Sequence, residues 1–200
     1  MLNHHIFRRG TEHSKNSNSL GFRSPEFEPN GILFLGCSFT YGLGVEQSQT
    51  FAALVSSVLN LPLCNCGTPG EGSDRAVSYA SVYSSLAPVY IIHLDLFENR
   101  RTWFLETGVI TASARCVWGV ERNDANLVDI CTSKPDTELH TLRNRLACEA
   151  IAARVGSRYL HYDRAWYETH IGECTDHPNR CDHMRIARAI IADIRALEDL

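Results

Sequence analysis

Residues 32–44 read ILFLGCSFTYGLG, and this stretch joins a strand signal to a turn signal. An apolar run of four residues ends at Gly36, and Ser38 follows two residues later. A buried strand that ends in a glycine turn can present a small nucleophilic hydroxyl at the edge of a sheet. The stretch is not a G-x-S-x-G elbow, because the next glycine after Ser38 is Gly42. It predicts an α/β fold and makes Ser38 a candidate nucleophile, with helix capping as its alternative role.

Composition narrows the class of protein. The chain has 200 residues, a formal net charge of −4 and 44% hydrophobic residues, which fits a single globular domain. This charge gives no general attraction to nucleic acid or to anionic membranes, so neither is expected as a partner. No stretch approaches the ~20 apolar residues of a membrane span. The N-terminus lacks the apolar core of a secretory signal, and we therefore expect a cytoplasmic protein.

The chain divides into a polar segment and a patterned domain. Residues 1–30 show no periodic apolar face, so we expect a flexible or loosely docked extension, followed by a domain over residues 31–200. From residue 31 strand and helix patterns alternate, which predicts a parallel sheet with helices on both faces. Residues 97–135 give no clear assignment. Strands are expected at 32–36, 63–66, 89–96 and 159–162, and helices at 51–59, 73–86, 136–155 and 182–197.

Hydrophobic spacing also predicts which helix faces are buried. In the helix at 51–59 the inward set is Phe51, Leu54, Val55, Val58 and Leu59. In the helix at 136–155 it is Leu139, Leu142, Leu146 and Ala150. In the last helix it is Ile186, Ala187, Ile190, Ile194 and Leu197.

Chemically active residue types follow the predicted strands. Ser38 follows the first strand, Gly70 the second and Asn99 the third, and His177 lies just before the last helix. The carboxyl ends of parallel strands meet at one edge of a sheet, so these residues can share a site. A serine nucleophile needs a nearby base, and its oxyanion needs N–H donors. Singly, each has an ordinary role: a turn glycine, an Asx-turn residue or an exposed loop histidine.

Four blocks of the sequence resemble the SGNH (GDSL-like) hydrolase superfamily, and together they span most of residues 31–198. They are GCSFTYGLGV, NCGTPGEGS, HLDLFENR and DHPNRCDHMRIA. The resemblance implies a three-layer αβα, flavodoxin-like fold and a serine ester hydrolase that forms an acyl-enzyme on Ser38, with His177 as general base. It implies oxyanion donors at the amides of Ser38 and Gly70 and at the Asn99 side chain. It also implies no cofactor and no metal, and a small-molecule or glycan substrate with a carboxylic, O-acyl or O-acetyl ester.

The chain departs from the family pattern at three places. Cys37 stands where the family often has Asp before the serine. The third block reads Phe-Glu-Asn-Arg rather than G-x-N-D, which puts the role of Asn99 in question. The family places an orienting Asp three residues before the histidine, and that position here is Cys174. The broken blocks leave a second hypothesis open: a catalytically degenerate SGNH-fold binding or assembly module.

Three arrangements could orient the imidazole of His177. Asp176 is adjacent to it in the chain and is the preferred candidate acid, and Glu173 is the alternative carboxylate. The third arrangement is a Ser–His dyad in which a backbone carbonyl replaces the acid.

The eight cysteines are expected to be free thiols, because the chain shows no secretory signal and is long enough to form a core. A zinc site on Cys174, His177 and Cys181 is an alternative, but their spacing matches no common zinc framework. His93 and His183 are assigned to structural roles.

Overall fold

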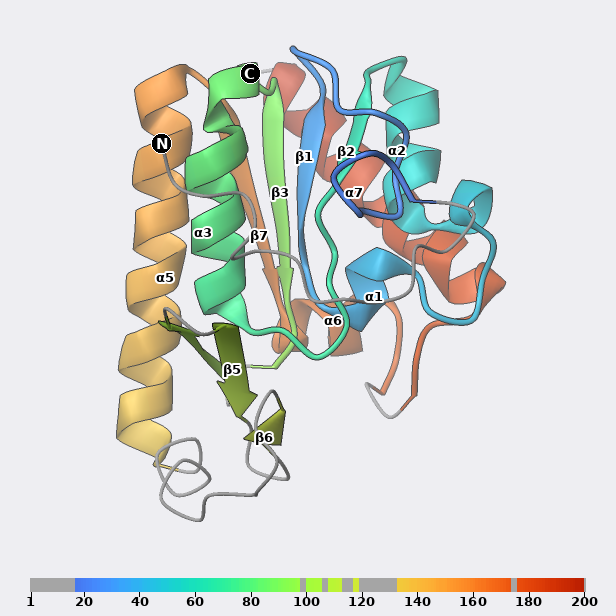
Figure 1. Ribbon diagram of the computed structural model, residues 1–200. Coiled ribbons are helices and arrows are strands. Elements are labelled where there is room, and N and C mark those ends of the chain that lie inside the picture. The colour runs from blue at the N-terminus through green and yellow to red at the C-terminus, as the bar shows by residue number, and fades with distance from the viewer. Residues whose placement is uncertain are drawn as a thin grey trace.

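The computed structural model describes residues 17–97, 100–105, 108–112, 117–118, 133–173 and 176–199. Its main sheet has four parallel strands in the order β2-β1-β3-β7 (Figure 1). The chain starts inside the sheet and adds strands on both sides, as flavodoxin-like folds do. The strands are β1 (Ile32–Gly36), β2 (Leu63–Asn65), β3 (Tyr90–Asp95) and β7 (Arg158–Asp163).

Helices cover both faces of this sheet (Figure 1). Alternate residues of β1 point to opposite sides, so Ile32 and Phe34 join one core while Leu33 and Leu35 join the other. The first core lies under α2 and α7, and the second lies under α3 and α5. This arrangement confirms the predicted three-layer αβα fold. The four helices are α2 (Phe51–Leu59), α3 (Ser73–Tyr83), α5 (Lys134–Val155) and α7 (Arg180–Glu198).

Several short elements were not expected from the sequence. A second, antiparallel sheet lies beyond the carboxyl ends of the parallel strands, next to one end of α5 (Figure 1). It occupies part of the segment that gave no clear assignment. The added elements are α1 (Ser38–Tyr41), β4 (Arg101–Leu105), β5 (Gly108–Ala112), β6 (Val117–Trp118), α6 (Arg164–His170) and 3-10 turns at Gln47–Gln49 and Ser84–Leu86.

The buried face of α5 differs from the prediction. The start of α3, which faces α5, is polar. Asn144 of α5 therefore turns inward and donates from Nδ2 to the Ser73 hydroxyl at 3.0 Å. Matching hydrogen bonds therefore decide this contact more than apolar spacing does. The residues predicted inward are exposed: Leu139, Leu142, Leu146 and Ala150. The buried residues are Thr137, His140, Asn144, Cys148 and Ala152.

The other two predicted faces are mostly confirmed. In α2, Phe51 and Val55 are buried, and Leu54 and Leu59 are half-buried against the core. In α7 the predicted residues Ile186, Ala187, Ile190 and Ile194 are all buried. Val58 and Leu197 are exceptions, with 54% and 43% of their surface exposed. Each lies in the last turn of its helix. Among the helices that the structure describes, none is long and apolar enough to cross a bilayer.

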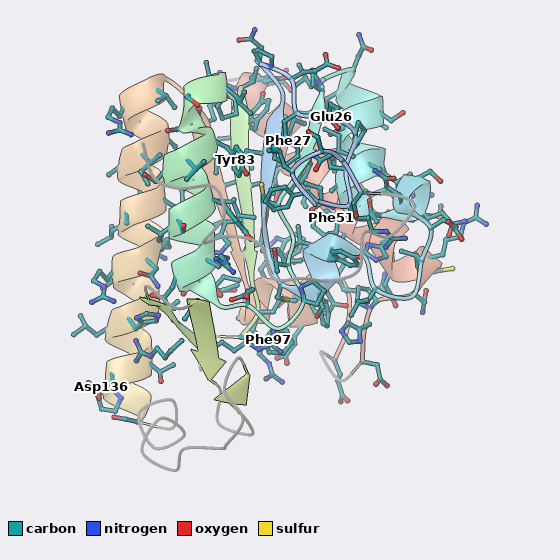
Figure 2. The ribbon with its side chains drawn as sticks, in the orientation of Figure 1. Glu26, Phe27, Phe51, Tyr83, Phe97 and Asp136 are labelled. Atoms are coloured by element: carbon teal, nitrogen blue, oxygen red, sulfur yellow. The ribbon has the colours of Figure 1, made fainter. Side chains whose placement is uncertain are left out.

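Residues 17–30 form a strap over α3. The rings of Phe22 and Tyr79 have centroids 5.1 Å apart, and so do those of Phe27 and Tyr83. Figure 2 shows Phe27 beside Tyr83 at this contact. Residues 1–16 lie outside the described part of the chain, so the expected looseness of the whole 1–30 extension stays a prediction.

Candidate active site

The structure brings Ser38 and His177 together. The Ser38 hydroxyl oxygen lies 2.9 Å from Nε2 of His177, a normal hydrogen-bond distance. Ser38 is the first residue of α1, directly beyond the end of β1, and it is buried, whereas His177 is exposed. A hydroxyl that donates to the unprotonated nitrogen of an accessible imidazole is the arrangement that activates a serine nucleophile.

Gly36 sets the turn that presents Ser38. Its φ of +151° lies in a region that side chains disfavour. A Cβ added there would lie 2.3 Å from Oγ1 of Thr40 and 2.7 Å from the carbonyl oxygen of Leu94. Only glycine lets the chain pass so close to β3 and turn directly into α1.

Arg23 holds the far end of α1. Its guanidinium donates to the carbonyl oxygens of Gly42 and Val45, each at 2.5 Å, and also lies over the Tyr41 ring. Gly42 is the C-cap of α1 and Val45 lies just beyond it, so the guanidinium fixes the chain where it leaves the helix. Arg23 belongs to the strap formed by residues 17–30, and the sequence gave no signal for this role.

The start of α7 positions His177. Asn179 caps the helix by accepting from the amides of Cys181 and Asp182, and Asp182 accepts from the Asn179 amide in return. This capping box fixes the loop just after His177. The imidazole also packs near the Phe39 ring, at a centroid distance of 5.5 Å. His177 is therefore held from its own loop and from α1.

The orienting acid has no support in the described part of the chain. Asp176 and Glu173 are exposed, and neither forms a hydrogen bond with His177 among the described residues. Cys174 lies outside the described residues. The preference for Asp176 as the acid is therefore untested, and the contacts among the described residues are those of a Ser–His pair without an acid.

Gly70 lies in a turn with φ +82°, and no atom comes within 4 Å of the place a Cβ would occupy. The next residue anchors this loop: Glu71 accepts from the Thr102 hydroxyl at 3.1 Å and pairs with Arg75 at 3.4 Å. Both partners of this ion pair are buried. Asn99, the other proposed oxyanion donor, lies outside the described residues.

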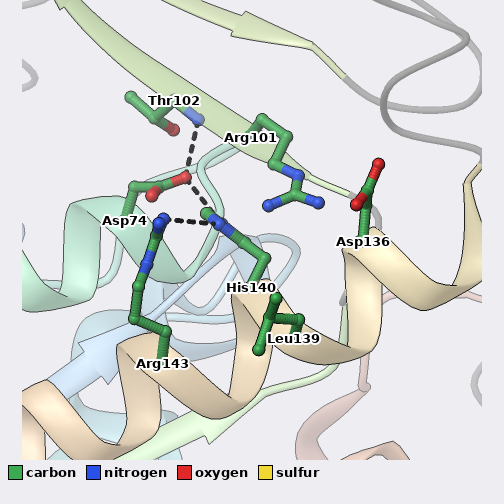
Figure 3. A pocket seen from close by; sticks show the side chains of 7 residues that line it. All are labelled: Asp74, Arg101, Thr102, Asp136, Leu139, His140 and Arg143. Carbon is green, nitrogen blue, oxygen red and sulfur yellow. Dashed lines mark hydrogen bonds and ion pairs between the residues drawn. The ribbon is translucent and has the colours of Figure 1, made fainter.

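A pocket of about 460 Å³ lies at the start of α3, where it is lined by Asp74, four residues after Gly70 in the chain (Figure 3). Asp74 accepts from the Thr102 amide at 2.8 Å and is bound by His140 at 3.0 Å. Burial alone would raise the pKa of the Asp74 carboxyl, but these hydrogen bonds lower it below its usual value. The pocket is lined by Asp74, Arg101, Thr102, Asp136, Leu139, His140 and Arg143.

The zinc hypothesis on Cys174, His177 and Cys181 gains no support. Among the described residues, Cys181 is an exposed free thiol and His177 belongs to no cluster of metal-ligand residues. The cysteines that the structure describes are free thiols, as predicted: Cys37, Cys64, Cys66, Cys148 and Cys181. His183 has the structural role expected, because its Nδ1 accepts from the Phe51 amide at 3.1 Å.

No protein-family model matches the sequence, and neither does any curated protein. Solved structures similar to this chain include a G-D-S-L-family protein described as lipolytic, from Desulfitobacterium hafniense DCB-2. It has 9% identity and a TM-score of 0.43, over 82% of this chain and 98% of that one. The psychrotrophic esterase EstA from Pseudoalteromonas sp. has 12% identity and a TM-score of 0.43, over 86% and 100%. A variant of an acetyl-xylooligosaccharide esterase from Geobacillus has 14% identity and a TM-score of 0.44, over 84% and 94%.

Proposed function

We propose that this chain is a serine ester hydrolase with Ser38 as nucleophile and His177 as general base. The observation that carries the proposal is the 2.9 Å contact between the Ser38 hydroxyl and Nε2 of His177. A base must lie within hydrogen-bond reach of the proton it removes, and this pair meets that requirement.

The proposed reaction starts from this contact. His177 takes the hydroxyl proton as Ser38 Oγ attacks the ester carbonyl, which forms a tetrahedral oxyanion. The amides of Ser38 and Gly70 and the Asn99 side chain are the proposed donors to that oxyanion. His177 then gives its proton to the departing alcohol, which leaves an acyl ester on Ser38. Water attacks this ester with His177 again as base, and the free acid departs.

We further propose that the pocket at the start of α3 holds the part of the substrate remote from the ester. Thr102 of its lining donates to Glu71, which follows Gly70 in the chain. The lining also combines arginine, histidine and aspartate side chains with one leucine. Charged heads on apolar stems suit a ligand that combines hydroxyl groups with apolar ring faces, such as a small glycan. The Arg143→Ala variant should raise KM for a glycan ester and leave KM for a simple aryl ester unchanged. Arg145→Ala, on the same helix outside the pocket lining, is the control.

Turnover of short-chain aryl esters tests the chemistry. Ser38→Ala should lower kcat/KM by about 1,000-fold or more, whereas Ser57→Ala, at an exposed position of α2, should leave it unchanged. A serine-reactive phosphonate should add one label per wild-type chain and none to Ser38→Ala. Equal labelling of that variant would contradict the role of Ser38.

The second candidate is a binding or assembly module on the same fold. The observation that favours it is the lack of a carboxylate hydrogen-bonded to His177 among the described residues. It predicts a well-folded wild type that binds its ligand but neither turns over esters nor reacts with the phosphonate. The same two measurements therefore separate the hypotheses.

A further inference from the structure

A second group of reactive side chains lies inside the fold, apart from Ser38 and His177. Strands β3 and β7 are neighbours, and their register places His93 opposite His161. Asp95 is two residues after His93, so its side chain points to the same face of the sheet. One ligand-type atom from each of these three residues lies within 4.8 Å of those of the other two. Within the described part of the chain, this is the one group that combines histidine and carboxylate in this way.

The three side chains lie close together, but Asp95 and His161 are too far apart to form a hydrogen bond. Nε2 of His161 lies 3.8 Å from Oδ2 of Asp95, which is too long for a hydrogen bond. Among the described residues neither atom has a hydrogen-bond partner, although Asp95 is only 5% exposed. Buried polar atoms are nearly always paired, and a buried carboxylate needs a compensating charge. The two atoms therefore face a common position that a cation would satisfy.

We propose that His93, Asp95 and His161 bind one zinc ion. Zinc takes imidazole nitrogen and carboxylate oxygen at about 2.0–2.2 Å in tetrahedral geometry, which places ligand atoms roughly 3.3–3.5 Å apart. The Asp95 and His161 atoms lie 3.8 Å apart and all three ligand atoms lie within 4.8 Å of one another, so binding would draw the three side chains inward by rotation. Two imidazoles select zinc over magnesium or calcium, which prefer oxygen ligands throughout.

The surroundings complete such a site. The Tyr159 hydroxyl lies 3.1 Å from Nδ1 of His93 and fixes the ring, as outer-shell partners of metal-bound histidines do. A cavity of about 10 Å³ borders His93 and Asp95, close to the volume that one water needs. A water there would supply the fourth ligand. The ion would tie β3 to β7, because His93 and Asp95 lie on the first strand and His161 on the second. The cavity also borders Gly36 and Cys37, which precede Ser38 in the chain.

The proposal is tested on the full-length protein after treatment with a chelator and dialysis. Calorimetric titration with zinc chloride should give one ion per chain. Thermal unfolding of the zinc-loaded protein should show a higher Tm than that of the chelator-treated protein. Cobalt(II) in its place should give the intense visible absorption of a four-coordinate site. Asp95→Asn and His161→Gln should each weaken zinc binding by more than about 100-fold, whereas His170→Gln, at an exposed position of α6, should bind as wild type.

Tyr159→Phe is a second test that remains usable if a variant of a ligand residue fails to fold. It keeps all three ligands and removes only the hydroxyl beside His93, so zinc affinity should fall about 10-fold to 100-fold. Failure of the wild type to bind stoichiometric zinc at 100-fold excess, with no change in Tm, would overturn the proposal. Wild-type affinity in the folded Asp95, His161 and Tyr159 variants would overturn it equally. Ester hydrolysis is measured separately, because the proposed chemistry of Ser38 and His177 does not depend on this site.

Discussion

The Ser38 hydroxyl and Nε2 of His177 lie 2.9 Å apart, although 139 positions separate them in the chain. Ser38 stands at the end of β1, and His177 stands at the entry to α7. Helix α7 packs beside α2 on one face of the sheet, and α2 follows the Ser38 turn in the chain. The contact therefore depends on the packing of one helical layer, and it should be lost when that packing or the Ser38 turn is disturbed.

Replacing Gly36 by alanine should damage both stability and activity. The new Cβ would meet the Leu94 carbonyl oxygen at 2.7 Å, and the φ of +151° disfavours any side chain. We expect a loss of about 3 kcal/mol in the free energy of unfolding and at least tenfold in ester turnover. Gly44→Ala is the matched control, because its φ of +87° is also positive but no atom lies within 4 Å. Equal losses in the two variants by urea denaturation would refute the close-approach argument.

Arg23→Met should loosen the carboxyl-terminal end of α1. The variant keeps much of the side-chain volume but loses the hydrogen bonds to the carbonyls of Gly42 and Val45. Removing the guanidinium loses these charge-assisted hydrogen bonds and leaves the two carbonyl oxygens without that donor. The expected loss in the free energy of unfolding is about 2 kcal/mol. We expect that loss of stability in urea denaturation, together with a lower kcat. Arg188→Met, at an exposed position of α7, should change neither quantity.

Glu71→Gln should be far more costly than a surface substitution of the same kind. Glu71 and Arg75 form a buried pair, with 1% and 2% of their side chains exposed, and removing one charge leaves the other buried. Breaking such pairs costs about 3–5 kcal/mol. Glu168→Gln breaks the exposed pair with Arg164 and should cost less than about 0.5 kcal/mol. Similar thermal shifts in the two variants would show that the loop after Gly70 is not anchored in this way.

Asp176→Asn tests whether an acid orients His177. Loss of an orienting carboxylate in a catalytic triad lowers kcat by about 10,000-fold. Asp176 is exposed, and no hydrogen bond joins it to His177 among the described residues, so we expect a loss of less than about tenfold. Steady-state kinetics on an aryl ester decide the matter, with Glu173→Gln measured in parallel. A loss of several thousand-fold for Asp176→Asn would establish a triad instead.

His183 should make the protein less stable in mild acid. Burial lowers the pKa of His183 to about 4; Asp182 opposes this effect, and Arg23 adds to it. The unfolded chain then binds a proton near pH 6.5 that the folded chain refuses until about pH 4, so this stability is present above pH 6.5 and is lost toward pH 4. Between pH 7.5 and pH 5 the expected loss is about 2 kcal/mol. Urea denaturation of His183→Gln, which can still accept from the Phe51 amide, should show a profile flatter by that amount.

The chain's own pattern determined the alternation of strands and helices. Apolar runs at β1 and β3 and the 3.6-residue spacing of α7 are local signals, so their positions and the parallel three-layer arrangement could be predicted. The turn at Gly36 could also be predicted, because a glycine directly follows the apolar run of β1. Ser38, Gly70 and His177 could be proposed from their places at strand and helix ends, because parallel strands bring those ends to one edge.

Tertiary contacts decided the rest. The buried face of α5 could not be read from its leucines, because it depends on the polar start of α3, which lies more than sixty positions away in the chain. Arg23 supports the end of α1 from the segment 17–30. Glu71 anchors the Gly70 loop through Thr102 of β4. The His93–Asp95–His161 group exists only because β7 adds beside β3 in one register. Spacing along a chain fixes periodicity, but hydrogen bonds and charge pairs between distant segments form only after the layers have packed.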